Sequence, residues 1–133
     1  MLYGIGCDLC SLSHLEKSLS SAHAAAFVRR VYGPAEQAAL GLLEGSAAPL
    51  NAHRLASAAA DFAAKEAFLK AAGVGLGGFS LGDIQVLRQE SGAPFYRLSG
   101  TAAAFAQPLT LHLTLSHEGE YALAFALFEK ADR

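Results

Sequence analysis

The sequence has no tryptophan, one methionine and only two cysteines among its 133 residues. Charged residues make up 17% of the chain, and no apolar run reaches the length needed to span a bilayer. With a formal net charge of -2, the basic excess typical of nucleic-acid-binding proteins is absent. The N-terminus, MLYGIGCDL, lacks the basic opening and long apolar stretch of a signal peptide. These absences predict a cytoplasmic protein that binds neither nucleic acid nor membrane.

The two cysteines form a single C-x-x-C, at Cys7 and Cys10. Redox motifs of this kind begin a helix, whose N-terminus stabilises the thiolate, whereas Cys7 falls within a predicted strand. A zinc site would need a second cysteine pair, which the sequence does not contain. We interpret both residues as inert, partly buried thiols.

Apolar and small residues are abundant instead, and 53% of the chain is hydrophobic. A chain of this length and composition suits one domain with a real core, so residues 1–133 are predicted to form a single domain. The many small residues favour close packing of helices. They also favour an apolar surface that a partner chain covers.

The first part of the chain predicts one strand followed by short helices. Residues 2–9 form the strand, and their glycines allow a close approach to its backbone. Residues 15–27 form a broken helical region that Ser11 or Ser13 can cap. Residues 34–36, Pro-Ala-Glu, fit the first turn of a further helix.

The remainder predicts one long helix and two hairpins. Residues 45–53 form a loop, residues 54–72 the main helix, and Gly73 its stop. The hairpins and a short helix between them follow as strands over 83–89 and 95–99, a helix over 101–106, and strands over 109–117 and 121–129. This order predicts an α+β domain whose helices pack on one face of a largely antiparallel sheet.

Three charges stand in the otherwise apolar stretch FAAKEAFLKAA of the main helix, at Lys65, Glu66 and Lys70. Glu66 precedes Lys70 by four residues, the favourable order for an exposed ion pair. The same spacing places a carboxylate and an ammonium one turn apart, which also suits a metal-bound phosphate ligand. Lys65 either faces solvent or contacts a nucleotide.

The glycines that end this helix, Gly73, Gly75 and Gly78, match G-x-G-x-x-G. That fingerprint of dinucleotide binding must follow a strand and open a helix, and here it follows a helix, which argues against a Rossmann site. Glycines nevertheless leave the backbone open to a phosphate or an adenosine.

A magnesium ion needs more oxygen ligands than Glu66 alone supplies. Asp8 is the only acid in the first predicted strand, near its C-terminal end, and is the obvious second carboxylate. An aspartate at a strand end can equally serve as a helix cap or a turn residue.

Over nearly its whole length the sequence resembles the holo-acyl-carrier-protein synthases, the small 4'-phosphopantetheinyl transferases. YGIGCDL is similar to the opening GIG-x-D strand of that family, and FAAKEAFLKAAGVGLGG to its strongest motif. FVRRVYGPAE, FSLGDIQVL with SGAP, and LHLTLSHEGEYALA follow the family pattern in the same order. The resemblance implies the 4'-phosphopantetheinyl transferase fold.

The resemblance also implies an activity. Members transfer phosphopantetheine from coenzyme A to a serine of apo acyl carrier protein, in support of fatty acid biosynthesis, and release adenosine 3',5'-bisphosphate. Carried over, Asp8 and Glu66 hold Mg²⁺ on the coenzyme A pyrophosphate, and Lys70 neutralises phosphate charge. Glu66, directly or through a metal-bound water, is the candidate base.

Gly73 and Gly75 are implied to lie beside the nucleotide, and His117 near its phosphate or adenosine end. The resemblance further implies a homotrimer with active sites shared between neighbouring subunits. His112 alternates with Leu111 and Leu113 on a predicted strand, so it is interpreted as a polar strand residue or a satisfied histidine.

Three positions depart from the family pattern. His14 and Asp61 each stand where the family has arginine, and Ala93 where it has lysine. Asp61 is expected to reverse a charge near the coenzyme A site. Since the carrier proteins are acidic, the lost positive charge can slow encounter or alter partner choice. Arg29 and Arg30 can supply part of a docking patch, or are a pair of solvated helix-end cations.

Two alternatives to an active transferase therefore stay open. One is a non-catalytic coenzyme A-binding subunit with altered carrier-protein recognition. The other is a structural trimer in which the motifs serve only packing, and it predicts no Mg²⁺-dependent binding of coenzyme A.

Overall fold

The computed structural model describes residues 1–42 and 50–131 and confirms the predicted order of elements. The elements in chain order are β1 (Leu2–Ser11), α1 (Leu12–Ser20), α2 (Ala24–Val31), α3 (Pro34–Leu40), α4 (Ala52–Ala72), the 3-10 turn η1 (Leu81–Asp83), β2 (Ile84–Arg88), β3 (Pro94–Leu98), α5 (Gly100–Ala106), β4 (Leu109–Glu118) and β5 (Tyr121–Lys130). None of the described helices is long and apolar enough to cross a membrane.

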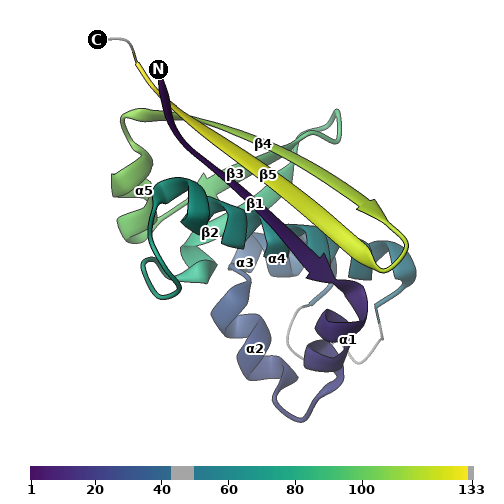
Figure 1. The fold of residues 1–133 in the computed structure, drawn as a ribbon. Helices are drawn as coiled ribbons and strands as arrows, with labels where there is room; N and C mark the ends of the chain where they lie inside the picture. Colours follow the sequence, from purple (N-terminus) through teal and green to yellow (C-terminus); the bar gives the residue numbers. More distant parts are fainter. Residues whose placement is uncertain (43–49, 132–133) are drawn as a thin grey trace.

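The strands form two separate antiparallel sheets. The larger has the order β1-β5-β4, so the first and last strands of the chain lie side by side (Figure 1). The smaller is the β2-β3 hairpin. In the larger sheet, Asp8 of β1 pairs with Ala124 of β5, which pairs in turn with Leu115 of β4.

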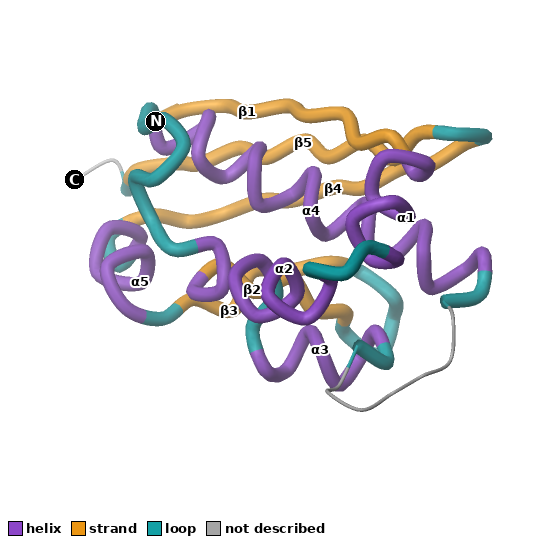
Figure 2. Tube along the Cα trace, turned by 90° about the horizontal axis from the view of Figure 1, so that it is seen from below, coloured by secondary structure: helices purple, strands orange, loops and turns teal. Residues whose placement is uncertain are grey.

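Helix α4 runs across one face of the larger sheet and is covered on its other side by the β2-β3 hairpin and the short helices (Figure 2). It begins at Ala52, slightly earlier than predicted, because the side chain of Asn51 accepts a hydrogen bond from the backbone N–H of Arg54 at 2.8 Å. The predicted loop over 45–53 therefore ends before Ala52, and its residues 45–49 lie outside the described part. Layers on both sides of α4 explain why most of its residues are buried.

The core surrounds α4 and includes its contact with the larger sheet. Four inward residues of β5 are fully buried, Ala122, Ala124, Ala126 and Phe128. Phe68 of α4 packs edge-on against the Phe128 ring, with 5.0 Å between the ring centroids. The small alanines let α4 lie close to the sheet, and the aromatic rings of Phe68 and Phe128 fill part of the space between them.

The opposite face of the larger sheet is exposed, and its β1 and β5 part is largely apolar. Ile5, Leu9, Leu123 and Phe125 are between 38% and 57% exposed on it. None of the described elements covers this face (Figure 2). The apolar surface expected from the composition is thus the outer face of the β1-β5-β4 sheet.

Candidate active site

Helix α4 lies directly on the backbone of β1 because two glycines of this strand carry no side chain. A Cβ atom at Gly4 would collide with the carbonyl oxygen of Ala71, and one at Gly6 with the carbonyl oxygen of Ala67. The close approach predicted for these glycines is confirmed, and the approaching element is α4. This contact brings the C-terminal half of β1 against the charged turn of α4.

Lys70 is tied to the end of β1 by two hydrogen bonds. Its Nζ donates to the carbonyl oxygen of Cys7 at 2.9 Å and to Oδ1 of Asp8 at 3.1 Å. The side chain of Lys70 is 56% exposed and that of Asp8 is 21% exposed, so a ligand can reach the pair. Within the described residues Lys70 makes no ion pair with Glu66, and the alternative of a simple pair along the helix is not realised.

Glu66 lies one turn before Lys70, half-buried and close enough to Asp8 for the two carboxylates to repel. Its pKa is raised, chiefly by burial and further by the Asp8 charge, while the Lys70 ammonium opposes the rise. The structure therefore brings Asp8, Glu66 and Lys70 into one cluster, which we call the carboxylate-lysine cluster.

A divalent cation suits this cluster by the chemistry of its donors. Mg²⁺ takes one or two carboxylates and completes its shell with phosphate oxygens and water. Asp8 and Glu66 provide two carboxylates, and a cation between them would relieve the repulsion that raises the pKa of Glu66. In the described part of the chain no group of three or more histidine, cysteine, aspartate or glutamate side chains can hold a metal. The protein itself would thus supply only part of the shell.

Two of the glycines after α4, Gly73 and Gly75, leave their backbone open. Gly73 ends the helix in the left-handed conformation, with φ 79°, and its N–H donates to the carbonyl of Lys70 at 3.1 Å. A Cβ at Gly73 or Gly75 would meet nothing within 4 Å. Gly73 is therefore required by its φ angle, and the backbone of Gly75 is accessible to a ligand.

His117 lies apart from the carboxylate-lysine cluster within one chain. It pairs with Ala122, which pairs with Cys10, two residues beyond Asp8 on β1. Two strand spacings and one pleat repeat separate the backbones of His117 and Asp8 by roughly 12 Å. The side chain is exposed at the end of β4.

His112 is the polar strand residue that its alternation predicted. It is exposed on the outer face of the larger sheet, together with Thr110, Thr114 and Ser116. Its Nε2 lies 3.7 Å from Oε2 of Glu129 on β5.

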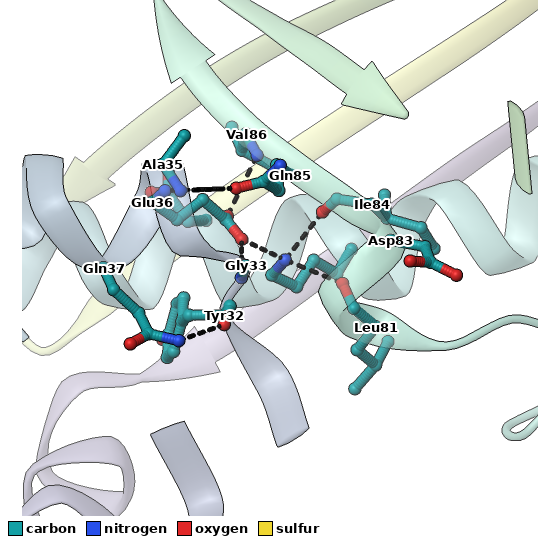
Figure 3. Close-up of polar contacts among 12 residues, drawn as sticks. Tyr32, Gly33, Ala35, Glu36, Gln37, Leu81, Asp83, Ile84, Gln85 and Val86 are labelled. Atoms are coloured by element: carbon teal, nitrogen blue, oxygen red, sulfur yellow. Dashed lines mark hydrogen bonds and ion pairs between the residues drawn. The ribbon is translucent and has the colours of Figure 1, made fainter. Parts of the chain in front are cut away.

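Lys65 is fully buried, so the expectation that it faces solvent or contacts a nucleotide is wrong. Its Nζ donates to Oε1 of Glu36 at 2.6 Å and to the carbonyl oxygens of Leu81 at 2.9 Å and Ile84 at 2.6 Å. Figure 3 shows these three acceptors converging from α3, η1 and the start of β2.

Burial lowers the pKa of Lys65 and raises the pKa of Glu36, in each case against the attraction of the other. Three acceptors satisfy the three N–H groups of an ammonium, and the Glu36 carboxylate also accepts two backbone N–H groups. We therefore describe the pair as charged. Sequence reasoning missed it because its members are 29 residues apart, and a lysine among buried alanines was the only signal.

Asp61 is only 2% exposed, so it does not present its charge to a ligand at the surface. Its Oδ1 accepts a hydrogen bond from Nη2 of Arg88 on β2 at 2.7 Å. Burial raises the pKa of Asp61 to about 7, against the opposing attraction of Arg88. The acid at this position is therefore paired with Arg88 inside the protein.

The other positions singled out for partner recognition are on the surface. His14 is exposed in the first turn of α1, whose cap is Ser11. Ala93 is exposed in the turn between β2 and β3, and Arg29 and Arg30 in the last turn of α2.

The two cysteines differ in their surroundings. Cys10 is buried, and its pKa is raised to about 11, mainly by burial and further by the charges of Asp8 and Glu66. Cys7 is exposed on the outer face of the sheet, so its interpretation as a partly buried thiol is wrong.

Comparison with known proteins identifies the family. The profile of the 4'-phosphopantetheinyl transferase superfamily matches residues 4–126. The chain belongs to this superfamily. The holo-[acyl-carrier-protein] synthase of Herminiimonas arsenicoxydans is 38% identical to this transferase over 133 residues, covering 98% of the chain and 99% of the relative. That of Methylobacterium sp. (strain 4-46) is 38% identical over 137 residues, covering 97% and 95%.

Solved structures share the fold of the transferase. The holo-(acyl-carrier-protein) synthase from Bacillus anthracis str. Ames in complex with CoA (3',5'-ADP) has a TM-score of 0.77 at 32% identity, over 98% of this chain and 99% of that one. The Chronobacterium ammoniagenes ACPS-CoA complex has a TM-score of 0.78 at 26% identity, over 96% and 97%. The predicted fold and family are confirmed, and the chain is an enzyme, a phosphopantetheinyl transferase.

Proposed function

We propose that this transferase moves the 4'-phosphopantetheine group of coenzyme A to a serine hydroxyl of apo acyl carrier protein, in support of fatty acid biosynthesis. The carboxylate-lysine cluster, open to solvent beside the glycines after α4, carries the proposal. The names of the relatives and the CoA complexes of two structural neighbours support it. The transferase domain is taken to span residues 1–133.

In this reaction the serine oxygen forms a bond to the phosphorus that bears pantetheine. The P–O bond of the pyrophosphate breaks, adenosine 3',5'-bisphosphate leaves, and the serine proton passes to a base. Glu66, directly or through a metal-bound water, is the proposed acceptor of this proton. Lys70, exposed at the same turn, would neutralise charge on the departing phosphate.

Asp8 and Glu66 are the residues that would hold Mg²⁺. When bound, the ion polarises phosphoryl oxygens and orients the pyrophosphate. Asp8 also accepts a hydrogen bond from the Lys70 ammonium at 3.1 Å, so it fixes Lys70 beside the proposed pyrophosphate site. The open backbone at Gly73 and Gly75 would accommodate the nucleotide.

We infer a homotrimer in which the outer face of the β1-β5-β4 sheet is buried between subunits. The apolar side chains on that face, Ile5, Leu9, Leu123 and Phe125, support this. In the shared site that we infer, His117 of one subunit would approach the phosphate or adenosine end of the nucleotide bound beside Asp8 of its neighbour. The carrier protein would approach the exposed α1 and α2, where Arg30 is the cation that matches the family pattern.

Intact-protein mass spectrometry of apo acyl carrier protein, incubated with this protein, coenzyme A and Mg²⁺, tests the transfer. We expect a mass gain of one phosphopantetheine group that is lost without metal and nearly abolished by Glu66→Gln. The matched control is Glu90→Gln, which changes an exposed glutamate in the β2-β3 turn and should retain full activity. No gain with several carrier proteins, despite measured binding of coenzyme A, would point to a non-catalytic subunit. Full activity of Glu66→Gln would remove Glu66 from the mechanism.

A further inference from the structure

Lys65 is a charged side chain of α4 that is directed into the protein, as Asp61 is on the same helix, and it is the one of the two that neighbours Glu66 of the carboxylate-lysine cluster. Its exposure is 0%, as is that of its partner Glu36. Each of the three N–H groups of the ammonium has an acceptor within 2.9 Å. A contact this fully satisfied fixes the side chain in one position.

Two of the three acceptors, the carbonyls of Leu81 and Ile84, belong to the 3-10 turn and to the residue that follows it. This turn comes directly after residues 73–80, which we call the glycine segment. The segment starts at Gly73, directly after α4. Just beyond its other end, the carbonyls of Leu81 and Ile84 accept hydrogen bonds from Lys65, which precedes Gly73 by eight residues. Eight helical residues span about 12 Å. Both ends of the segment are thus fastened to α4, one by the chain and one by Lys65.

Polar contacts help to set the position of α4, and those of Lys65 lie next to Glu66. The surface that α4 presents to β1 and β5 consists largely of alanine, and alanines make only shallow ridges for the neighbouring layer to grip. A buried ion pair is often replaceable by apolar side chains without loss of stability, so it is weak evidence for a stabilising role. The three directional hydrogen bonds of Lys65 instead act on the rotation of α4 about its axis. That rotation sets the direction of Glu66, the next residue.

We propose that Lys65 is a positioning residue of the coenzyme A site, which holds the glycine segment and the face of α4 that carries Glu66 in one fixed relation. The proposal rests on the proposed function, since it takes the glycine segment to line the nucleotide. Lys65 itself contacts no substrate. Its loss should therefore weaken coenzyme A binding through the position of residues 73–80.

The test measures the dissociation constant of coenzyme A by calorimetry, and kcat and KM by transfer, for Lys65→Met and a matched control. The control is Tyr96→Phe, which removes a hydrogen bond of 2.6 Å from the tyrosine hydroxyl to the carbonyl of Ala64. It loosens α4 at the neighbouring residue but leaves the glycine segment fastened. We expect Lys65→Met to raise the dissociation constant and KM by about tenfold to a hundredfold, and Tyr96→Phe to leave both nearly unchanged.

Lys65→Met leaves the buried Glu36 carboxylate without its counter-charge, although two backbone N–H groups still donate to it, so folding is checked by circular dichroism. The double variant Glu36→Gln/Lys65→Met removes both charges and should fold while binding coenzyme A as weakly as the single variant. The proposal is overturned if a folded variant lacking Lys65 binds like the wild type, if Tyr96→Phe weakens binding equally, or if the double variant does not fold. A wild-type protein that binds coenzyme A but transfers nothing contradicts the proposed function alone. One that does not bind coenzyme A contradicts both.

Discussion

Lys70 of α4 donates from Nζ to Oδ1 of Asp8 on β1 at 3.1 Å, across 62 residues of sequence. The contact joins the opening strand of the chain to the end of its central helix. It exists because Gly4 and Gly6 allow the helix to lie on the strand backbone. The geometry of the site is therefore inseparable from the packing of β1 on α4.

Replacing Lys70 by methionine should lower kcat by about 10²- to 10³-fold, because the departing phosphate loses a fixed cation. The measurement is the rate of carrier-protein modification at saturating coenzyme A. Lys130→Met is the control, since Lys130 is an exposed cation at the opposite end of the sheet. A kcat within twofold of the wild type would exclude Lys70 from stabilising the leaving group.

Gly6→Ala should destabilise the fold by at least ~1–3 kcal/mol, because the new methyl group meets the backbone carbonyl of Ala67, which cannot move aside as a side chain can. Urea unfolding measures the loss. Gly75→Ala is the matched variant for stability, since a Cβ there meets nothing within 4 Å. Equal free energies of unfolding for both variants would show that β1 and α4 do not pack at backbone distance.

Asp61 should make the protein less stable as the pH rises. Its pKa in the folded protein is about 7, above the ordinary value of 3.8, so the folded state binds the extra proton between these values. The stabilisation is full below about pH 4 and is lost as the pH approaches 7. The Arg88 charge beside Asp61 lowers this pKa against the effect of burial. The more distant Glu36 charge raises the pKa, and the Lys65 charge lowers it.

The comparison with Asp61→Asn isolates this effect, because asparagine keeps the acceptor for Arg88 but does not titrate. Free energies of unfolding of both proteins are measured from pH 4.5 to 8. The wild type should lose stability relative to the variant over this range. A relative gain with rising pH would mean that attraction to Arg88 outweighs the cost of burying the carboxylate.

Phe125→Glu should separate the inferred trimer, because it places a charge at the centre of the apolar outer face of the sheet, where Phe125 is 38% exposed in the single chain. Light scattering coupled to size-exclusion chromatography gives the mass. Ala93→Glu adds the same charge in the exposed β2-β3 turn and should leave the mass of three chains. A wild type that is already monomeric would contradict both the inferred trimer and the site shared between subunits.

Much of the fold was predictable from local pattern. The strand pairs over 83–99 and 109–129 follow from alternation and turn residues, and the end of α4 follows from Gly73. Asp8, Glu66 and Lys70 were also identifiable, two by helical spacing and one as the only acid of the first strand. Such features depend on a few neighbouring residues, so the sequence is enough to predict them.

The fate of the remaining charges was decided only by tertiary structure. Lys65 was expected to face solvent or contact a nucleotide, and Asp61 to reverse a charge near the coenzyme A site. Both are instead buried, with Glu36 and Arg88 as partners 29 and 27 residues away along the chain. Whether a charged side chain meets solvent or a partner depends on which element packs over it, and local periodicity does not contain that information. The sequence by itself determined the elements, the family and the carboxylate-lysine cluster. The layers packed on both sides of α4 determined which of its charges are exposed to bind a ligand and which are buried to hold the helix in place.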